Sequence, residues 1–215
     1  MFEAFTITLA ALVAMQLSPG PNLIAVASTA LGQGRQAAFA VAAGVACGAF
    51  IWVLTISVGL GALVTAYPVL VTVMKLSGGA YLLWLGLKGL LSAFKGSATN
   101  LSEETSSASE QMVLSSHVKR GLLVVMTNPK AALGWAAIAS FMFGSGLSAW
   151  QVATFAPIAA ASSVTIYGGY GFLFSTQSVA RFYRRFWRVM DGLFGTAFGV
   201  LGAKLLWDGL KEAKL

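Results

Sequence analysis

Apolar stretches of about 20 residues recur along nearly the whole chain, and they limit its fold more than any other feature. Wound as an α-helix, a stretch of that length spans the roughly 30 Å hydrocarbon core of a bilayer. Hydrophobic residues make up 57% of the chain and charged residues only 10%, whereas soluble domains average about 25% charged residues. Lipid is therefore the solvent for most side chains, and the sequence predicts an all-α membrane protein.

Six spans are expected, each end placed to within about 2–4 residues, at residues 3–30, 37–64, 69–92, 118–143, 149–175 and 187–208. The first span starts with Glu3 instead of basic residues and is too long for a secretory signal peptide, so we expect it to be retained. Residues 95–117 are polar and carry no apolar helical stripe. The sequence thus predicts two three-helix halves, 1–94 and 118–215, joined by a linker at 95–117.

Lysines and arginines flank these spans on one side, which is typical of the cytoplasmic side of a membrane. They are Arg35, Lys88, Lys95, Lys119, Arg120, Arg181, Arg184, Arg185 and Arg188. The connections near Tyr67-Pro68 and at residues 144–146 carry no charge. We therefore expect a cytoplasmic linker and external termini. The net charge of +7 is then a signal of topology, and it does not indicate a nucleic-acid-binding face.

A weak internal repeat relates the third span to the sixth. Shifting the chain by 116 positions makes seven of eighteen residues identical between residues 73–90 and 189–206. The identical pairs are Val73/Val189, Met74/Met190, Gly79/Gly195, Leu85/Leu201, Gly86/Gly202, Lys88/Lys204 and Leu90/Leu206. Helices separated by three spans cross in opposite directions, as an inverted-topology repeat requires. The sequence therefore predicts six transmembrane helices as a 3+3 inverted-topology repeat.

The first span is interrupted by Ser18-Pro19-Gly20-Pro21-Asn22. Its two prolines remove backbone donors and clash with preceding carbonyls, while Gly20 loosens the chain, so a continuous helix is not expected. In hydrocarbon the freed backbone groups need partners, and such a break is tolerated mainly where it lines a cavity. The alternative is a simple proline kink.

The fourth span has a break in the matching position of the second half, at Thr127-Asn128-Pro129-Lys130. Paired interruptions of this kind indicate a binding site. After each proline a helix starts inside the membrane, and its unpaired N–H groups favour an anion such as a carboxylate. Lys130 adds a positive charge there and should face the protein interior, although snorkelling toward the interface is the alternative.

These residues resemble the signatures of the lysine exporter (LysE/RhtB) amino-acid efflux family, and in particular its homoserine/threonine exporters. The matching positions are Ser18-Pro19-Gly20-Pro21, Asn128-Pro129-Lys130, Gly44 and Gly48, Gly78 with Tyr81 and Leu82, and Met190-Asp191-Gly192. The resemblance covers essentially the whole chain. One position departs from the pattern, because the residue after the first signature is often Asp in the family and is Asn22 here. A proton-carrying role for that carboxylate cannot be transferred.

The resemblance implies a secondary transporter in a bacterial inner membrane that exports a small amino acid, neutral like threonine or homoserine, using an ion gradient such as that of protons. The residues expected to bind substrate are those of the two breaks: Ser18, Pro19, Gly20, Pro21, Asn22, Asn128, Pro129 and Lys130. Asp191 is the acid that falls in a span and is the candidate proton relay. An interfacial ion pair with Arg188, three residues earlier, is its alternative role.

Other function classes have less support. A membrane enzyme or redox carrier needs clustered bases, metal ligands or a cysteine pair, but Cys47 is the only cysteine and His117 the only histidine. A passive channel, or an exporter of ions such as metal cations, has less support because the predicted spans hold few acids or thiols that could bind a cation. The sequence has no ATP-binding loop of the Gly-x-x-x-x-Gly-Lys-Ser/Thr type, so we expect the energy for transport to come from an ion gradient. We expect no catalytic residue, metal or cofactor, and no nucleic-acid partner.

Small residues four positions apart occur at Gly44/Gly48 and at Gly195/Gly199. This spacing lets helix backbones approach closely in lipid. It fits both packing within one chain and the interface of a homodimer, and we favour packing within the chain.

Overall fold

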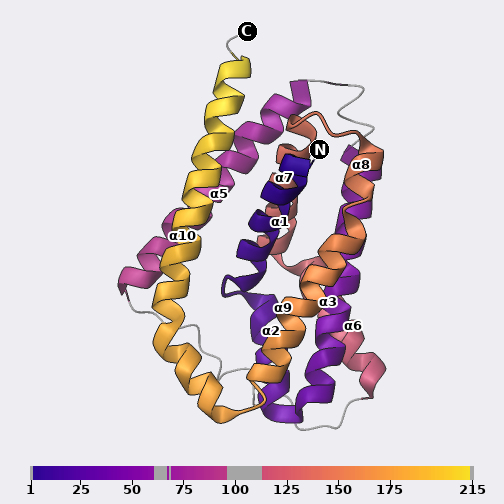
Figure 1. Ribbon diagram of the computed structural model, residues 1–215, viewed down its shortest axis with the longest axis vertical. Helices are drawn as coiled ribbons and strands as arrows, with labels where there is room; N and C mark the ends of the chain where they lie inside the picture. The colour runs from indigo at the N-terminus through magenta and orange to yellow at the C-terminus, as the bar shows by residue number, and fades with distance from the viewer. Residues whose placement is uncertain (1, 61–66, 68, 96–112, 214–215) are drawn as a thin grey trace.

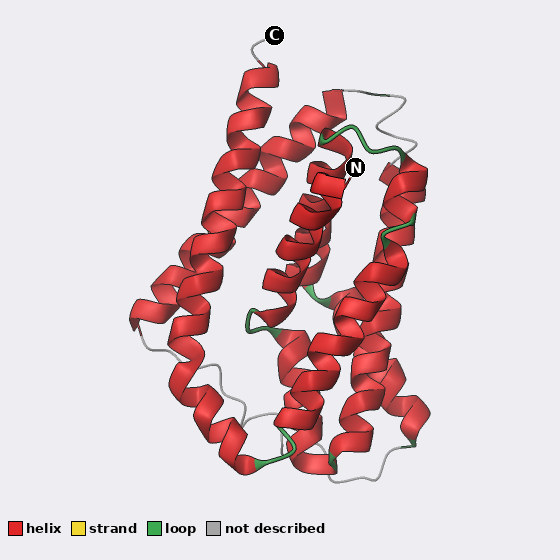
Figure 2. Ribbon diagram, in the orientation of Figure 1, coloured by secondary structure: helices red, strands yellow, loops and turns green. Residues whose placement is uncertain are grey.

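The computed structural model describes residues 2–60, 67, 69–95 and 113–213, and within them every regular element is helical (Figures 1 and 2). The all-α class is therefore confirmed. The helices are α1 (Phe2–Leu17), α2 (Pro21–Gln33), α3 (Arg35–Thr55), the π-helical turn η1 (Ile56–Leu60), α5 (Val69–Lys95), α6 (Leu114–Thr127), α7 (Pro129–Gly144), α8 (Ala149–Ala153), α9 (Ala156–Leu173) and α10 (Gln177–Ala213).

Two helical stretches are long and apolar enough to cross a membrane. They are Arg35–Gly59, formed by α3 and most of η1, and Ala149–Leu173, formed by α8 and α9. Two bent pairs each pass the same criterion together. Phe2–Leu17 and Pro21–Gln33 meet at 51°, and Leu114–Thr127 and Lys130–Gly144 meet at 62°. The described residues thus hold up to four candidate spans by length and composition. The two bent pairs correspond to the predicted spans at 3–30 and 118–143, which are the two expected to contain breaks. A total of six spans in a 3+3 inverted repeat stays a prediction.

Two helices begin earlier than hydropathy suggested. The helix α6 starts at Leu114 instead of near 118, because His117, Gly121 and Val125 form a buried stripe with helical spacing along its polar sequence. The helix α10 starts at Gln177 instead of near 187, since an arginine-rich stretch has good helix propensity although it is not apolar. Residues 96–112 of the predicted linker lie outside the described residues.

Glycines bring α3 and α6 into backbone contact. A Cβ atom added to Gly44 would overlap the carbonyl oxygen of Val118, and one added to Gly121 would overlap that of Val41. Gly48 likewise faces Val125 of α6. The Gly44/Gly48 pair therefore serves packing within one chain, as favoured from the sequence.

The helices α5 and α10 pack against each other as an antiparallel pair, at the left of the view in Figure 1. Gly79 packs on the backbone of Gly202, and Gly86 packs on that of Gly195. In the repeat with a shift of 116 positions, Gly79 corresponds to Gly195 and Gly86 to Gly202. Exchanging the two halves therefore maps the contact of Gly79 with Gly202 onto the contact of Gly86 with Gly195. The pair is thus packed as a two-fold relation between the third and sixth helices would require.

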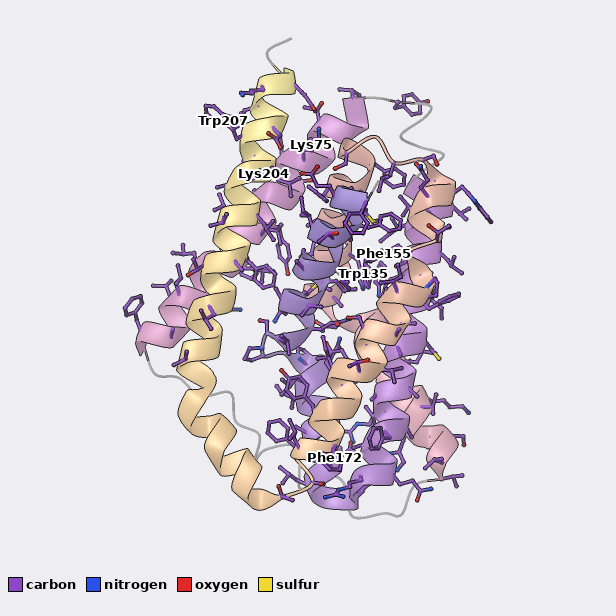
Figure 3. All side chains as sticks on the ribbon, in the orientation of Figure 1. Lys75, Trp135, Phe155, Phe172, Lys204 and Trp207 are labelled. Atoms are coloured by element: carbon purple, nitrogen blue, oxygen red, sulfur yellow. The ribbon has the colours of Figure 1, made fainter. Side chains whose placement is uncertain are left out.

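Both termini lie at one end of the molecule, together with the end of α7 (Figure 1). The connection between α2 and α3 and the start of α6 lie at the opposite end, where the guanidinium of Arg35 stacks 4.4 Å from the ring centre of Phe172 (Figure 3). The apolar core between the ends is contributed mainly by α1, α2, α3, α7 and α9, and Trp135 and Phe155 are among its largest members. Which end faces the cytoplasm stays a prediction.

Candidate site at the paired helix breaks

Each break ends one helix and starts another with a proline at the first helical position. The helix α2 starts at Pro21 and α7 starts at Pro129. Proline suits this position because the first N–H of a helix has no intrahelical partner to lose. Asn128 caps α7, since its Oδ1 accepts a hydrogen bond of 3.0 Å from the backbone N–H of Lys130. No described side chain caps the first turn of α2, so that helix start remains suited to an anion.

Two buried asparagines connect the breaks directly. The amide of Asn128 donates to Oδ1 of Asn22 over 3.1 Å, and the amide of Asn22 donates to the hydroxyl of Tyr167 over 3.4 Å. Asn22 is 9% exposed and Asn128 5%. This chain of hydrogen bonds joins α2, α7 and α9, so residues from both halves of the sequence meet at one place.

Lys130 reaches from the second break across to the first. Its ammonium donates to the Ser18 hydroxyl at 2.7 Å, to the Pro19 carbonyl at 2.7 Å and to the Ser18 carbonyl at 3.4 Å. The last backbone hydrogen bond of α1 is that from Ser18 N–H to the Ala14 carbonyl, so these acceptors lie at the C-terminal, negative end of the α1 dipole. Lys130 therefore extends from the second break to the first, and its role in binding substrate stays a prediction.

Gly20 leaves room for this lysine. A Cβ atom at Gly20 would lie 3.3 Å from Cδ and 3.4 Å from Nζ of Lys130, which is tighter than ordinary van der Waals contact. Its backbone is extended, with φ 174° and ψ −179°, so the glycine is explained by the crossing of the lysine side chain and not by an unusual backbone conformation.

Two cavities adjoin the breaks. A small one of about 20 Å³ lies among Ser18, Asn22, Asn128 and Lys130. A larger one of about 400 Å³ is lined by Ser18, Pro19, Gly20, Pro21, Asn128 and Lys130 and, across from them, by Tyr81, Trp84, Lys88 and Phe198. Its volume is within the range of about 300–1,000 Å³ found for small-molecule sites. Seven of the eight predicted site residues line one or both cavities, and nothing is described of the Pro129 side chain.

A third cavity, of about 290 Å³, opens between α1, α5, α7 and α10 toward the end that holds the termini. Lys75 and Lys204 contribute to its lining (Figure 3), and Lys75 forms an ion pair with Glu212. Leu85 and Phe198 line both this cavity and the larger one at the breaks. These two side chains therefore lie between the two spaces.

Polar residues of α9 were missed in the sequence. Tyr167 bonds to Asn22, as described above, and the Tyr170 hydroxyl donates to the Leu17 carbonyl at the end of α1 over 3.1 Å. Gln16 donates to Ser163 and accepts from Ser162. The available signal was helical spacing, because Ser163, Tyr167 and Tyr170 lie on one face of an otherwise apolar span.

Asp191 lies within α10, but its side chain and that of Arg188 are outside the described residues. Its role as a proton relay or ion-pair partner therefore stays a prediction. Among the described residues, no group of three or more His, Cys, Asp or Glu side chains could hold a metal ion.

Comparison with known proteins gives one family. The profile described as LysE type translocator matches residues 13–209. The threonine efflux protein of Salmonella typhimurium is 26% identical over 212 residues, covering 96% of this chain and 98% of that protein. The threonine efflux protein of Escherichia coli K12 is 27% identical over 207 residues, covering 94% and 96%. The leucine efflux protein of Enterobacter sp. is 37% identical over 119 residues, about half of each chain (54% and 53%). No solved structure is significantly similar.

Proposed function

Because the chain belongs to the LysE type translocator family, we propose that it is a secondary transporter that exports a small neutral amino acid from the cytoplasm. Members of this family are transporters and not enzymes, and the chain is a multi-pass bacterial membrane protein. Threonine is the first substrate to test because relatives aligned along nearly the whole chain carry threonine efflux names. Homoserine and leucine follow.

The observation that carries the proposal is the meeting of the two breaks at Lys130. The lysine supplies a positive charge beside the start of α2, whose first N–H groups have no side-chain cap among the described residues. A carboxylate placed between them would gain both an ion pair and the favourable end of a helix dipole. The adjoining cavity of about 400 Å³ has room for a small amino acid.

Transport itself would proceed by alternating access between the halves 1–94 and 118–215 acting as a 3+3 inverted-topology repeat. The symmetric contacts of Gly79 and Gly86 with α10 support that relation. The cavity at the breaks and the cavity toward the termini are separated by Leu85 and Phe198. Movement of α5 and α10 relative to α1 and α7 would connect the substrate site to one side or the other. We propose a proton gradient as the energy source.

Export of labelled amino acids tests this function. Cells or right-side-out vesicles loaded with threonine, homoserine, leucine, lysine or glutamate would be compared with and without the protein, and with and without a compound that collapses the proton gradient. We expect the protein to speed the loss of neutral amino acids, and the collapse of the gradient to slow it. If no amino acid of the panel leaves faster when the protein is present, the proposed function is wrong.

A further inference from the structure

The end of α1 already binds an ammonium group, which is that of Lys130. Its described acceptors include three oxygen atoms, the Ser18 hydroxyl and the carbonyls of Ser18 and Pro19. A primary ammonium has three N–H donors, and the acceptors lie at the helix end where the dipole favours a cation. The geometry is therefore that of a built site for R–NH₃⁺, occupied here by a side chain of the protein.

An amino-acid substrate carries the same chemical group. The cavity of about 400 Å³ is lined by Ser18, Pro19 and Lys130 themselves, so a ligand in it can reach both the acceptors and the lysine. We propose that the α-ammonium of the substrate replaces the Lys130 ammonium on the Ser18 and Pro19 oxygens, and that the displaced Lys130 then pairs with the substrate carboxylate. This exchange rests on the proposed function and assigns the atoms that would recognise each end of the amino acid.

Charge balance makes the exchange selective for zwitterions. Before binding, the Ser18 and Pro19 oxygens accept from one cation, the Lys130 ammonium. After binding, the substrate ammonium takes those acceptors, Lys130 takes the carboxylate, and no charge has been left unpaired. A ligand with only an ammonium would take the Ser18 and Pro19 oxygens from Lys130 and place a second cation beside it without bringing a carboxylate, and the repulsion between two cations in a partly buried site is costly. A ligand with only a carboxylate would draw Lys130 away and leave the α1 carbonyls without a donor, which is also unfavourable.

The side chain of Lys130 has the freedom that the exchange needs. It is partly buried and lines the cavity of about 400 Å³ together with Gly20, which has no side chain to restrict it. Four single bonds separate its Cα from its Cε, so Nζ can move by several ångströms without any change in the backbone. The acceptors, in contrast, belong to the backbone and to the short side chain of Ser18, and they stay in place when the lysine leaves.

The test compares three ligands on the purified full-length protein in nanodiscs. Threonine carries both charges, threoninol only the ammonium, and N-acetylthreonine only the carboxylate. Binding would be measured by calorimetry for the wild type and for Lys130→Met. We expect the wild type to bind threonine at least about tenfold more tightly than either analogue, since each analogue forfeits a charge-assisted hydrogen bond.

In Lys130→Met the preference should reverse. The oxygens of Ser18 and Pro19 are then vacant, there is no lysine to displace, and the substrate carboxylate has lost its partner. Threoninol should therefore bind Lys130→Met at least about tenfold more tightly than it binds the wild type. It should also bind Lys130→Met more tightly than threonine does. If the methionine variant does not fold, the same comparison is made in Lys130→Gln, which can still donate to Ser18 but leaves no charge behind when displaced.

The outcomes separate this inference from the proposed function. If the wild type binds and exports threonine but neither neutral variant gains affinity for threoninol, the ammonium site is wrong and the exporter stands. If the wild type neither binds nor exports any amino acid of the panel, the proposed function fails first. Reversal of the preference for threoninol over threonine supports the exchange of Lys130 for the substrate ammonium.

Discussion

At the scale of single residues, Lys130 and Asn22 hold together two chain segments that are more than a hundred positions apart. The Ser18 hydroxyl and the Lys130 ammonium are 112 positions apart in sequence and 2.7 Å apart in space. Asn22 and Asn128 add a second link at a separation of 106 positions. Asn22 and Asn128 are buried, and Ser18 and Lys130 are partly buried. Loss of one asparagine would therefore leave the other with an unmet donor or acceptor.

Asn22→Leu should destabilise the protein and weaken export. The substitution removes the acceptor for the Asn128 amide and the donor to Tyr167 while keeping a similar volume, and an unsatisfied buried polar group costs about 1–3 kcal/mol. The melting temperature in nanodiscs and the export of labelled threonine are the measurements. Asn22→Asp is the matched control, because its carboxylate oxygen can still accept from Asn128. A leucine variant as stable and active as the wild type would show that the hydrogen bonds of Asn22 contribute neither to stability nor to export.

At the scale of elements, the helices are brought close where glycine lacks a side chain. The backbones of α3 and α6 touch at Gly44 and Gly121, and in lipid such close approach supplies van der Waals contact that apolar burial cannot supply between helices. The same device is used between α5 and α10 at Gly79 and Gly86. Each half of the chain is thus attached to the other by glycine contacts.

Gly44→Ala should lower the stability of the protein by about 1–3 kcal/mol, the usual cost of forcing an extra carbon into a packed interface. The new Cβ would overlap the carbonyl oxygen of Val118, a backbone atom of α6 that cannot move cheaply. Gly169→Ala is the matched control, since no described atom lies within 4 Å of the position of its Cβ and alanine is the better helix former. Thermal unfolding of both variants decides the matter, and equal melting temperatures would contradict the packing described.

Much of the architecture could be predicted from the sequence because its signals are local. Pro19, Pro21 and Pro129 identify the breaks, since proline removes a donor wherever it stands. The all-α class follows from apolar length alone. The spacing of Gly44 and Gly48 predicts that α3 packs closely against another helix, although it does not reveal that α6 is the partner.

The rest depended on contacts between distant segments. The charge and position of Lys130 predict that it faces inward, but they do not reveal that it binds the carbonyls at the end of α1. Tyr167 and Tyr170 were missed because their hydrogen-bond partners, Asn22 and Leu17, lie in distant segments of the chain. A buried tyrosine hydroxyl usually has such a partner, but the sequence does not show which one. The start of α6 was placed too late because His117 is polar, and only its partner helix shows that it is buried, at 2% exposure.

At the scale of the whole molecule, the two ends differ in charge in a way that predicts orientation. Ser145 is exposed at the end that holds the termini, and Ser115 is exposed at the start of α6, at the opposite end. In a background with Cys47→Ala, Ser145→Cys should react with a membrane-impermeant maleimide in intact cells, and Ser115→Cys should react only after the membrane is opened. The reverse pattern would place the basic loops outside and overturn the predicted direction of the helices.

Asp191 is the candidate for a proton relay, so the proposed coupling to a proton gradient is tested at this residue. If Asp191 pairs with Arg188 near the interface, Asp191→Asn forfeits a contact of about 0–1 kcal/mol, and gradient-driven export should persist at close to the wild-type rate. Initial rates would be measured in proteoliposomes with an imposed pH gradient and, separately, as exchange without a gradient. Loss of gradient-driven export with exchange preserved would instead assign Asp191 to the proton path.

The central claim is that the two helix breaks form one substrate site through Lys130, and exchange without any gradient tests it most directly. Proteoliposomes loaded with unlabelled threonine would receive labelled threonine outside, and the initial rate of its entry would be measured. The wild type would be compared with Lys130→Met and with the control Lys119→Met, which changes an exposed lysine on α6. We expect Lys119→Met to exchange like the wild type and Lys130→Met to lose at least about tenfold in rate, because an inward lysine beside a helix start is removed. Exchange by Lys130→Met at the wild-type rate would contradict the assignment of the breaks as the substrate site.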